Sequence, residues 1–256
     1  MRIRIAQVRV VPEKGNLKGN YERLMSILGE VAKETVDVVV TPECFLDGYV
    51  ATEASVGAEQ LGEYAIDPSQ SPYVSGVSKW AGAASTWFIF GCSRISLTGV
   101  HNTALIIDRQ GILKGWYDKT HCQIHDKKYL PGQTLPVFNS DFGPFGVLIC
   151  ADRRWPETVR SLALQGARVI FNPTYGVHDE RNMHMMQTRS YESEIFIAFT
   201  HPVQSLLTDP TGKIICNDTA TDTHYSLSEI DLSEVDAARM SSLAHLRDRR
   251  PDVYTR

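Results

Sequence analysis

Short β-branched segments that alternate with helical patterns restrict the fold of this chain more than any other feature of its sequence. Apolar runs of this length predict buried strands, and apolar residues at helical spacing predict amphipathic helices. Strands are expected over residues 2–10, 36–41, 87–93, 103–108, 112–117, 145–150, 169–172, 195–200, 205–208 and 213–216. Helices are expected over residues 20–36, 78–86, 156–166 and 183–193. Strands that alternate with helices and with hairpins predict an α/β protein with mixed sheets.

The chain contains no internal repeat, low-complexity tract or Pro/Gly/Ser linker, so residues 1–256 are expected to form one domain. The formal net charge of −4 and the lack of Lys/Arg runs argue against binding to nucleic acid or to an anionic membrane. The sequence has no signal-peptide pattern and no apolar stretch of about 18 residues, so a soluble, cytoplasmic protein is expected.

Five cysteines are scattered along the chain without CxxC pairs, which argues against a disulfide framework and against a zinc ribbon. Cys150 differs from the others because it closes an apolar strand, and Pro156 soon afterwards opens a helix. A sharp strand-to-helix turn exposes a nucleophile and leaves backbone N–H groups, here that of Ala151, available to an oxyanion. A thiol needs a nearby cation or base to become a thiolate, and without one a strand-end cysteine is usually a core residue.

Two charged residues at other strand ends provide the groups that the thiol needs. Glu43 follows the strand over 36–41, and Lys119 follows the strand over 112–117. Singly, each is most simply a solvated surface charge. Together with Cys150 they provide a general base, a cation for the oxyanion and a nucleophile. Because ligands bind outside the carboxyl ends of strands in α/β sheets, the three residues are expected to meet in one active site.

Three motifs in this order and spacing resemble those of the nitrilase, or carbon–nitrogen hydrolase, superfamily. They are Pro42-Glu43 with Gly48-Tyr49, Tyr117-Asp118-Lys119-Thr120-His121, and Cys150-Ala151-Asp152-Arg153-Arg154-Trp155-Pro156-Glu157. Further matches, over a resemblance that extends from Arg2 to about Tyr254, are Asn102-Thr103, Arg189 with Glu192, and Asp209-Pro210-Thr211-Gly212. The resemblance implies an α-β-β-α sandwich, no cofactor, a homo-oligomer, and hydrolysis of a non-peptide C–N bond through a cysteine thioester. It also implies that Cys150 attacks, Glu43 is the base and Lys119 stabilises the oxyanion.

The residues after the cysteine indicate a branch of the family. Asp152 lies two positions after Cys150, and the run Asp-Arg-Arg-Trp-Pro-Glu is similar to that of N-carbamoyl-D-amino-acid amidohydrolases. True nitrilases usually carry Trp-Glu after the cysteine, so the resemblance favours an amide or N-carbamoyl substrate over a nitrile. Those carbamoylases have longer loops near the Lys motif and the C-terminus than this chain has, so the carbamoylase branch is a hypothesis beside a simple amidase.

The sequence departs from the family pattern at a second carboxylate near the lysine. Most relatives carry a glutamate there, where this chain reads His125-Asp126-Lys127-Lys128-Tyr129-Leu130-Pro131-Gly132. Alignment on the tyrosine selects Asp126, and alignment on Pro-Gly selects His125. Asp126 is preferred because it keeps a carboxylate near Lys119, although a shift of about 1 Å in a catalytic group can cost on the order of 100-fold. Asp118, which replaces the usual arginine beside the lysine, is expected to face solvent.

Further residues are candidates for the substrate pocket: Ala151 through its backbone N–H, and three aromatic side chains for which packing in the core is the alternative. The substrate-binding candidates are Tyr49, Ala151, Trp155 and Tyr175. His178 and His184 are further candidates, with a surface or helix-facing position as the alternative. The cluster His121-Cys122-His125-Asp126 has the spacing of a zinc site only if it is helical. It lies beside Pro-Gly and is expected to be a loop, so no metal is expected.

Two other functions are alternatives to a hydrolase. A catalytically weak or inactive binding or regulatory protein would keep the fold, and Asp126 is the feature that motivates this alternative. An acyltransferase would use the same thioester and pass the acyl group to an amine or thiol. The intact set of Glu43, Lys119 and Cys150 favours an enzyme whose partner is a small-molecule amide or carbamoyl substrate.

Overall fold

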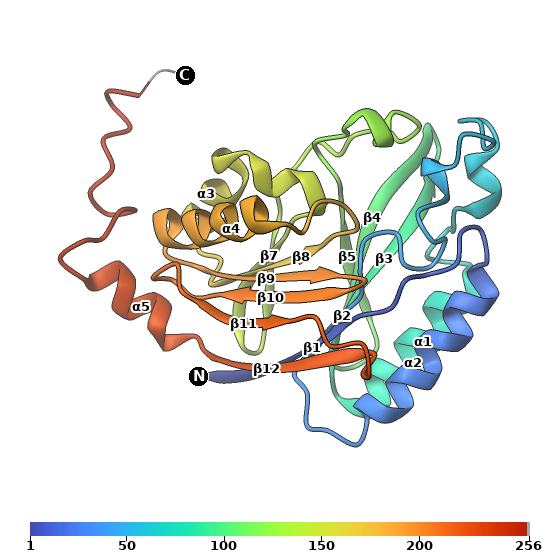
Figure 1. Cartoon of the computed structure of the whole chain (residues 1–256), viewed down its shortest axis with the longest axis horizontal. Helices are drawn as coiled ribbons and strands as arrows, with labels where there is room; N and C mark the ends of the chain where they lie inside the picture. The colour runs from blue at the N-terminus through green and yellow to red at the C-terminus, as the bar shows by residue number, and fades with distance from the viewer. Residues whose placement is uncertain (255–256) are drawn as a thin grey trace.

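Two six-stranded mixed sheets pack face to face in the computed structural model, which describes residues 1–254 (Figure 1). The first sheet has the order β12-β1-β2-β3-β4-β5 and contains β1 (Arg2–Val8), β2 (Val38–Val40), β3 (Trp87–Ser96), β4 (Gly99–Ile107), β5 (Leu113–Asp118) and β12 (Tyr225–Asp231). The second has the order β11-β10-β9-β8-β7-β6 and contains β6 (Val137–Ser140), β7 (Gly143–Val147), β8 (Val169–Pro173), β9 (Phe196–His201), β10 (Gln204–Thr208) and β11 (Ile214–Asp218). Each sheet combines parallel pairs, such as β1–β2 and β7–β8, with antiparallel pairs, as the sequence predicts.

Helices cover the outer faces of both sheets, so the predicted α-β-β-α sandwich is confirmed (Figure 1). The helices on the first sheet are α1 (Leu17–Val31) and α2 (Pro72–Ala84), and those on the second are α3 (Pro156–Leu164) and α4 (Glu180–Ser193). A further helix, α5 (Ser233–Met240), follows β12. Short 3-10 turns are η1 (Val50–Thr52), η2 (Leu61–Tyr64), η3 (Ile124–Asp126) and η4 (Cys150–Arg154).

Alternation along the strands gives the first sheet two apolar faces. In β3, Phe88 and Phe90 belong to the core under α1 and α2, whereas Trp87 and Ile89 belong to the core between the sheets. A strand that is buried on both faces reads as a continuous apolar run, which is the pattern the sequence shows here. The apolar runs therefore indicate a sheet that is covered on both faces.

All the strands and helices that the sequence predicts are present, but several of their ends differ. α1 stops at Val31, before the predicted end, and α2 starts at Pro72 rather than at residue 78. Ser71 accepts a hydrogen bond from the backbone N–H of Val74, and proline occupies the first turn, so a local cap starts α2 early. The sequence patterns do not indicate β6, β12 or α5.

The predicted strand over residues 145–150 is wrong at its end. β7 stops at Val147. The Ile149 backbone N–H donates to the side chain of Asp152 instead of continuing the sheet ladder. Cys150 begins η4 with a φ of 46°, so the thiol lies in a left-handed turn beyond the strand and not at its last position.

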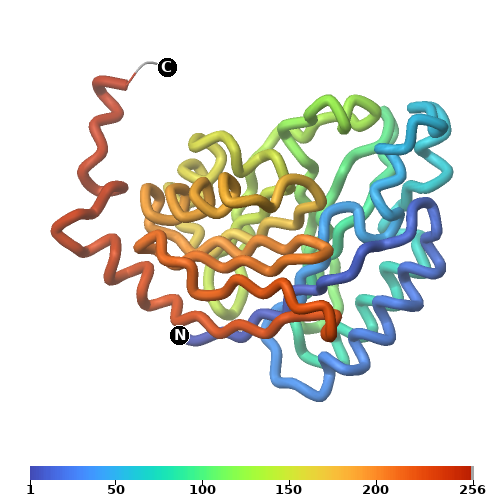
Figure 2. Tube along the Cα trace, in the orientation of Figure 1, coloured from blue at the N-terminus to red at the C-terminus, as the bar shows by residue number. Residues whose placement is uncertain are grey.

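The two ends of the chain meet in the first sheet, where β1 pairs antiparallel with β12. Figure 2 shows that the chain after α5 leaves the sheets and runs outside the sandwich. None of the helices described within residues 1–254 has the length and apolarity that a bilayer crossing requires.

Candidate active site

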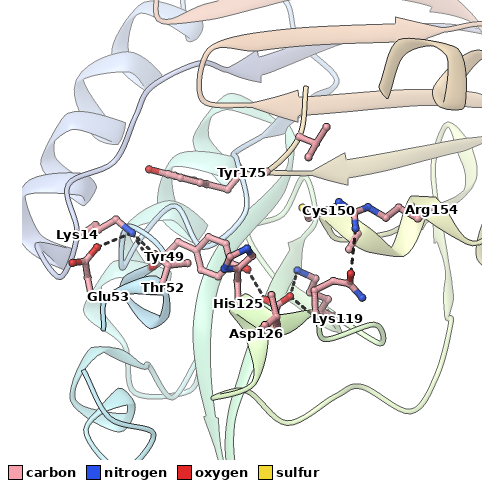
Figure 3. A pocket seen from close by; sticks show the side chains of 15 residues that line it. Lys14, Tyr49, Thr52, Glu53, Lys119, His125, Asp126, Cys150, Arg154 and Tyr175 are labelled. Atoms are coloured by element: carbon pink, nitrogen blue, oxygen red, sulfur yellow. Dashed lines mark hydrogen bonds and ion pairs between the residues drawn. The ribbon is translucent and has the colours of Figure 1, made fainter. Parts of the chain in front are cut away.

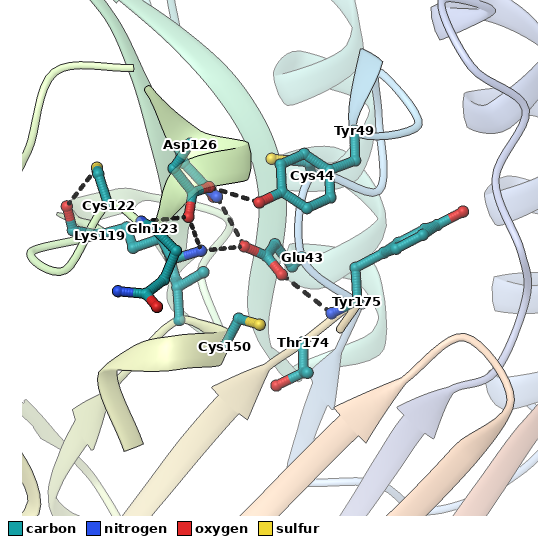
Figure 4. Close-up of polar contacts among 12 residues, drawn as sticks. Glu43, Cys44, Tyr49, Lys119, Cys122, Gln123, Asp126, Cys150, Thr174 and Tyr175 are labelled. Atoms are coloured by element: carbon teal, nitrogen blue, oxygen red, sulfur yellow. Dashed lines mark hydrogen bonds and ion pairs between the residues drawn. The ribbon is translucent and has the colours of Figure 1, made fainter. Parts of the chain in front are cut away.

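Segments that follow strands of both sheets converge beside one cavity (Figure 3). Glu43 lies shortly after β2, Lys119 directly follows β5, and Cys150 lies shortly after β7. Figure 4 shows these side chains grouped together, with the Cys150 thiol on the side of Glu43. The first sheet positions the carboxylate and the ammonium, and the second positions the thiol, so the site exists only where the two sheets face each other.

Lys119 lies between two carboxylates. Its Nζ is 2.8 Å from Oε1 of Glu43 and 2.7 Å from Oδ2 of Asp126, and each of the three side chains is at most 1% exposed. Burial alone would lower the pKa of Lys119, but the negative charges of Glu43, of a Cys150 thiolate and of Asp126 raise the pKa well above its usual value. The lysine is therefore a fixed cation at neutral pH.

Donors on three sides hold the Glu43 carboxylate. Oε1 accepts hydrogen bonds from Lys119 Nζ and from Asn102 Nδ2, each at 2.8 Å. Oε2 accepts one from the backbone N–H of Tyr175 at 3.0 Å. Asn102, on β4, belongs to the sequence resemblance, whereas no sequence pattern marks the Tyr175 backbone. Oε2 has one protein donor where Oε1 has two, so it has the greater remaining capacity to accept a proton.

Asp126, and not His125, contacts the lysine. Besides Lys119, the Asp126 carboxylate accepts hydrogen bonds from the Tyr49 hydroxyl and from the backbone N–H of Gln123. His125 is exposed and lines the cavity. The aspartate therefore keeps a second carboxylate beside Lys119 despite its shorter side chain.

The prediction that Asp118 faces solvent is wrong. Its side chain is 14% exposed and forms an ion pair with Arg94 at 2.7 Å. It also accepts a hydrogen bond from the Thr103 hydroxyl. Because β4 lies between β3 and β5, the pairing of these strands brings Arg94 and Asp118 close together, which local sequence does not indicate.

The thiol of Cys150 is buried in a tight turn. An added Cβ at Gly176 would lie 3.2 Å from Sγ, so the glycine permits the close approach of this segment to the thiol. Burial raises the pKa of the Cys150 thiol, and the charge of Glu43 raises it further. Lys119, Arg153 and the Tyr175 backbone N–H act in the opposite direction, but the net pKa stays above that of a free cysteine. The resting thiol is therefore protonated at neutral pH and needs a base.

Asp152 connects the cysteine turn to the lysine segment. It is fully buried, and its Oδ1 accepts from the Thr120 hydroxyl at 3.0 Å and from the His121 backbone N–H at 2.8 Å. Its Oδ2 accepts from the Tyr117 hydroxyl at 2.7 Å and from the Ile149 backbone N–H at 3.0 Å. These bonds fix the position of η4 relative to the segment that carries the ammonium.

The cavity beside these groups has a volume of about 610 Å3 (Figure 3). Its lining consists of Lys14, Tyr49, Thr52, Glu53, Lys119, Gln123, Ile124, His125, Asp126, Cys150, Ala151, Arg154, Tyr175, Gly176 and Val177. Three of the four substrate-binding candidates, Tyr49, Ala151 and Tyr175, therefore line it. Trp155 does not, because its ring stacks on that of His121 with centroids 4.1 Å apart. This volume accommodates a small molecule.

The two histidine candidates lie outside the cavity lining. His178 and His184 are both exposed, and the His178 ring stacks on that of His201 at 4.2 Å. Within residues 1–254, no group of three or more His, Cys, Asp or Glu side chains is arranged to hold a metal ion.

Sequence reasoning missed an ion pair in the cavity wall. Lys14 Nζ lies 3.1 Å from Oε1 of Glu53 and 5.9 Å from the centre of the Tyr175 ring. The two charges come from different loops, so no local motif joins them. Arg154, by contrast, belongs to the cysteine motif, and its Nη1 donates to Gln123 Oε1 at 3.2 Å.

The chain is similar to known proteins over nearly its whole length. A family model described as Carbon-nitrogen hydrolase matches residues 2–240. The chain is 26% identical to a nitrilase of Pyrococcus abyssi over 99% of its own length and 100% of that protein, and 25% identical to a mouse omega-amidase over 99% and 96%. The crystal structure of Saccharomyces cerevisiae Nit3, a member of branch 10 of the nitrilase superfamily, aligns with a TM-score of 0.82 at 22% identity over 97% of each chain. The predicted family and fold are thereby confirmed.

Proposed function

Because the chain belongs to the carbon–nitrogen hydrolase family, we propose that it hydrolyses a linear amide or N-carbamoyl group through a thioester on Cys150. The observation that carries this proposal is the buried pair of Lys119 and Glu43 beside the protonated thiol at the cavity. The similarity to a mouse omega-amidase supports an amide substrate, whereas the similarity to a nitrilase supports a nitrile. Asp152, two positions after the cysteine, is the residue that the amidase and carbamoylase motif carries there, so we favour an amide or N-carbamoyl substrate over a nitrile.

In the first step, Glu43 Oε2 accepts the proton of Cys150, and Sγ attacks the carbonyl carbon of the substrate. The C–S bond forms as the carbonyl π electrons move to oxygen. The fixed charge of Lys119 and the backbone N–H of Ala151 stabilise that oxyanion. The raised pKa of the thiol explains why proton transfer to a neighbouring carboxylate is needed before attack.

In the second step, Glu43 gives the proton to the leaving nitrogen, the C–N bond breaks, and ammonia or an amine departs. Glu43 then takes a proton from water, which attacks the thioester carbon, and the acid product leaves as the thiol is restored. Asn102 and Tyr175 keep the carboxylate in place through both steps. Asp126 positions Lys119 from the opposite side.

Ammonia release from a panel of linear amides, N-carbamoyl compounds and nitriles tests this proposal. Turnover of amides or carbamoyl compounds, with nitriles inert, is the expected result. Release from nitriles alone would contradict the substrate class. Release from aliphatic amides and none from carbamoyl amino acids would remove the carbamoylase branch and leave the amidase.

Intact-mass analysis after rapid quenching tests the thioester. We expect an increase equal to the acyl group, located on the peptide that contains Cys150. Added hydroxylamine should divert this intermediate to a hydroxamate, and a much faster reaction with an amine or thiol than with water would favour the acyltransferase alternative. The homo-oligomer stays a prediction that light scattering of the purified protein would check.

A further inference from the structure

Arg153 is a buried cation for which residues 1–254 provide no ion-pair partner. The residue is 1% exposed and is among the largest fully buried side chains. Arginine is seldom buried unless a carboxylate neutralises it, because a charge that leaves water loses its solvation. The neighbouring Arg154 is exposed and lines the cavity, so the two adjacent arginines of the cysteine motif occupy different environments.

Neutral acceptors from three segments surround the Arg153 guanidinium. Nη1 donates to the backbone carbonyl of Cys150, and Nη2 donates to that of Val177 at 2.7 Å. Nε donates to Oδ1 of Asn182 on α4 at 2.7 Å, and the guanidinium carbon lies 5.0 Å from the centre of the Phe199 ring. One side chain therefore joins the cysteine turn, the segment after β8 and α4.

The segment that Arg153 holds carries groups that act on the thiol. The Tyr175 backbone N–H donates to Glu43, and Gly176 lies against Sγ of Cys150. Because Arg153 donates to the carbonyls of both Cys150 and Val177, it ties the cysteine turn to the segment whose Tyr175 backbone N–H holds Glu43. The acceptors of its hydrogen bonds are neutral, so no carboxylate bound to the guanidinium offsets the electrostatic field that Arg153 exerts on the nearby sulfur.

We propose that Arg153 is a positioning residue whose buried, unneutralised charge promotes formation of the Cys150 thiolate and whose fork of hydrogen bonds fixes the thiol against Glu43. The charged groups that face the sulfur are Glu43, Lys119 and Arg153. Glu43 raises the pKa of the thiol, and the two cations lower it. The inference rests on the proposed role of Cys150, but its main test does not require turnover.

The test is the pH dependence of iodoacetamide alkylation, followed on the peptide that contains Cys150. Arg153→Met and Arg153→Gln remove the charge, and Arg153→Lys keeps it without the planar fork. The neutral variants should raise the midpoint pH of alkylation by about 1, which corresponds to about tenfold slower alkylation at neutral pH. Arg153→Lys should leave the midpoint near its native value. In an active preparation, Arg153→Lys should lower kcat about tenfold or more, because the thiol is no longer held by the planar fork. Its KM should change little, because Arg153 does not line the cavity.

Arg181→Met is the matched control, because Arg181 is 88% exposed and loses only a surface pair with Asp179. Its alkylation midpoint should equal that of the native protein. A folded neutral variant with the native midpoint would overturn the proposal. If both neutral variants fail to fold, Arg153→Lys decides, since a native kcat in that variant contradicts the positioning role. Failure of the protein to hydrolyse any amide would contradict the proposed function, but the alkylation result would still test the effect of Arg153 on the thiol.

Discussion

Lys119→Met removes the cation between Glu43 and Asp126 and keeps much of the apolar stem of the side chain. The ammonium lies 2.8 Å from one carboxylate and 2.7 Å from the other, and all three side chains are at most 1% exposed. The variant therefore leaves two buried carboxylates without their counter-ion. Loss of one partner from a buried ion pair costs about 3–5 kcal/mol, so we expect the free energy of unfolding to fall by about that amount.

Urea unfolding at neutral pH measures this loss, and Lys33→Met is the control. Lys33 pairs with Glu30 at 2.6 Å, but the two side chains are 68% and 61% exposed. Solvent screening limits such surface pairs to about 0–1 kcal/mol, so this variant should unfold within about 1 kcal/mol of the native protein. If Lys119→Met loses no more stability than Lys33→Met, the reasoning that burial makes this ion triad a structural unit is refuted.

The same variant makes a prediction about pH. The pKa of Lys119 in the folded protein is raised by its carboxylate neighbours, so its stabilising effect is complete below the ordinary lysine value of about 10.4. That contribution is lost only as the pH rises through the higher folded value. The stability difference between native protein and Lys119→Met should therefore be equal at pH 7 and pH 9. The kcat should fall about 100- to 1000-fold at both, as for loss of an oxyanion donor.

Three other substitutions give separate tests. Glu43→Gln should lower turnover about 100- to 10,000-fold, because it removes the general base. It should nevertheless speed iodoacetamide alkylation of Cys150 at neutral pH, because the Glu43 charge raises the pKa of that thiol. Slower alkylation would contradict this effect of Glu43 on the thiol. Gly176→Ala places a Cβ 3.2 Å from the Cys150 sulfur, so kcat should fall about 10- to 100-fold while the melting temperature changes little. Burial and the nearby His178 lower the pKa of His201 from 6.5 to about 4, so the unfolded chain binds more protons between these values and stability should fall as the pH drops through that window. His201→Asn should reduce this loss in urea unfolding at pH 4.5 and pH 7, and an unchanged slope would show that His201 does not cause it.

The strands that deliver the site could be predicted because each one is marked locally. An apolar run that ends at Glu43, at Lys119 or near Cys150 carries both the strand and its functional residue in a few adjacent positions. The resemblance then joined these separate signals into one site. The exact position of the thiol was missed, because η4 depends on the bond from Ile149 to Asp152, which competes with the sheet ladder.

Features that depend on long-range pairing could not be predicted. β12 forms by pairing with β1 from the far end of the chain, and its sequence alone does not indicate that partner. The ion pair of Asp118 with Arg94, and that of Lys14 with Glu53, also join separate segments. Burial of Arg153 beside an exposed Arg154 depends on which side of η4 faces α4, and this information is absent from a run of two arginines.

Turnover by Cys150→Ala, relative to the native protein on the most active amide of the panel, is the decisive test of covalent catalysis by Cys150. We expect ammonia release to fall at least about 1000-fold in a variant that remains folded, because the substitution removes the nucleophile that forms the thioester. Release within about tenfold of the native rate would contradict it, since a deficit that small is about 1.4 kcal/mol of transition-state stabilisation and cannot represent the loss of the nucleophile.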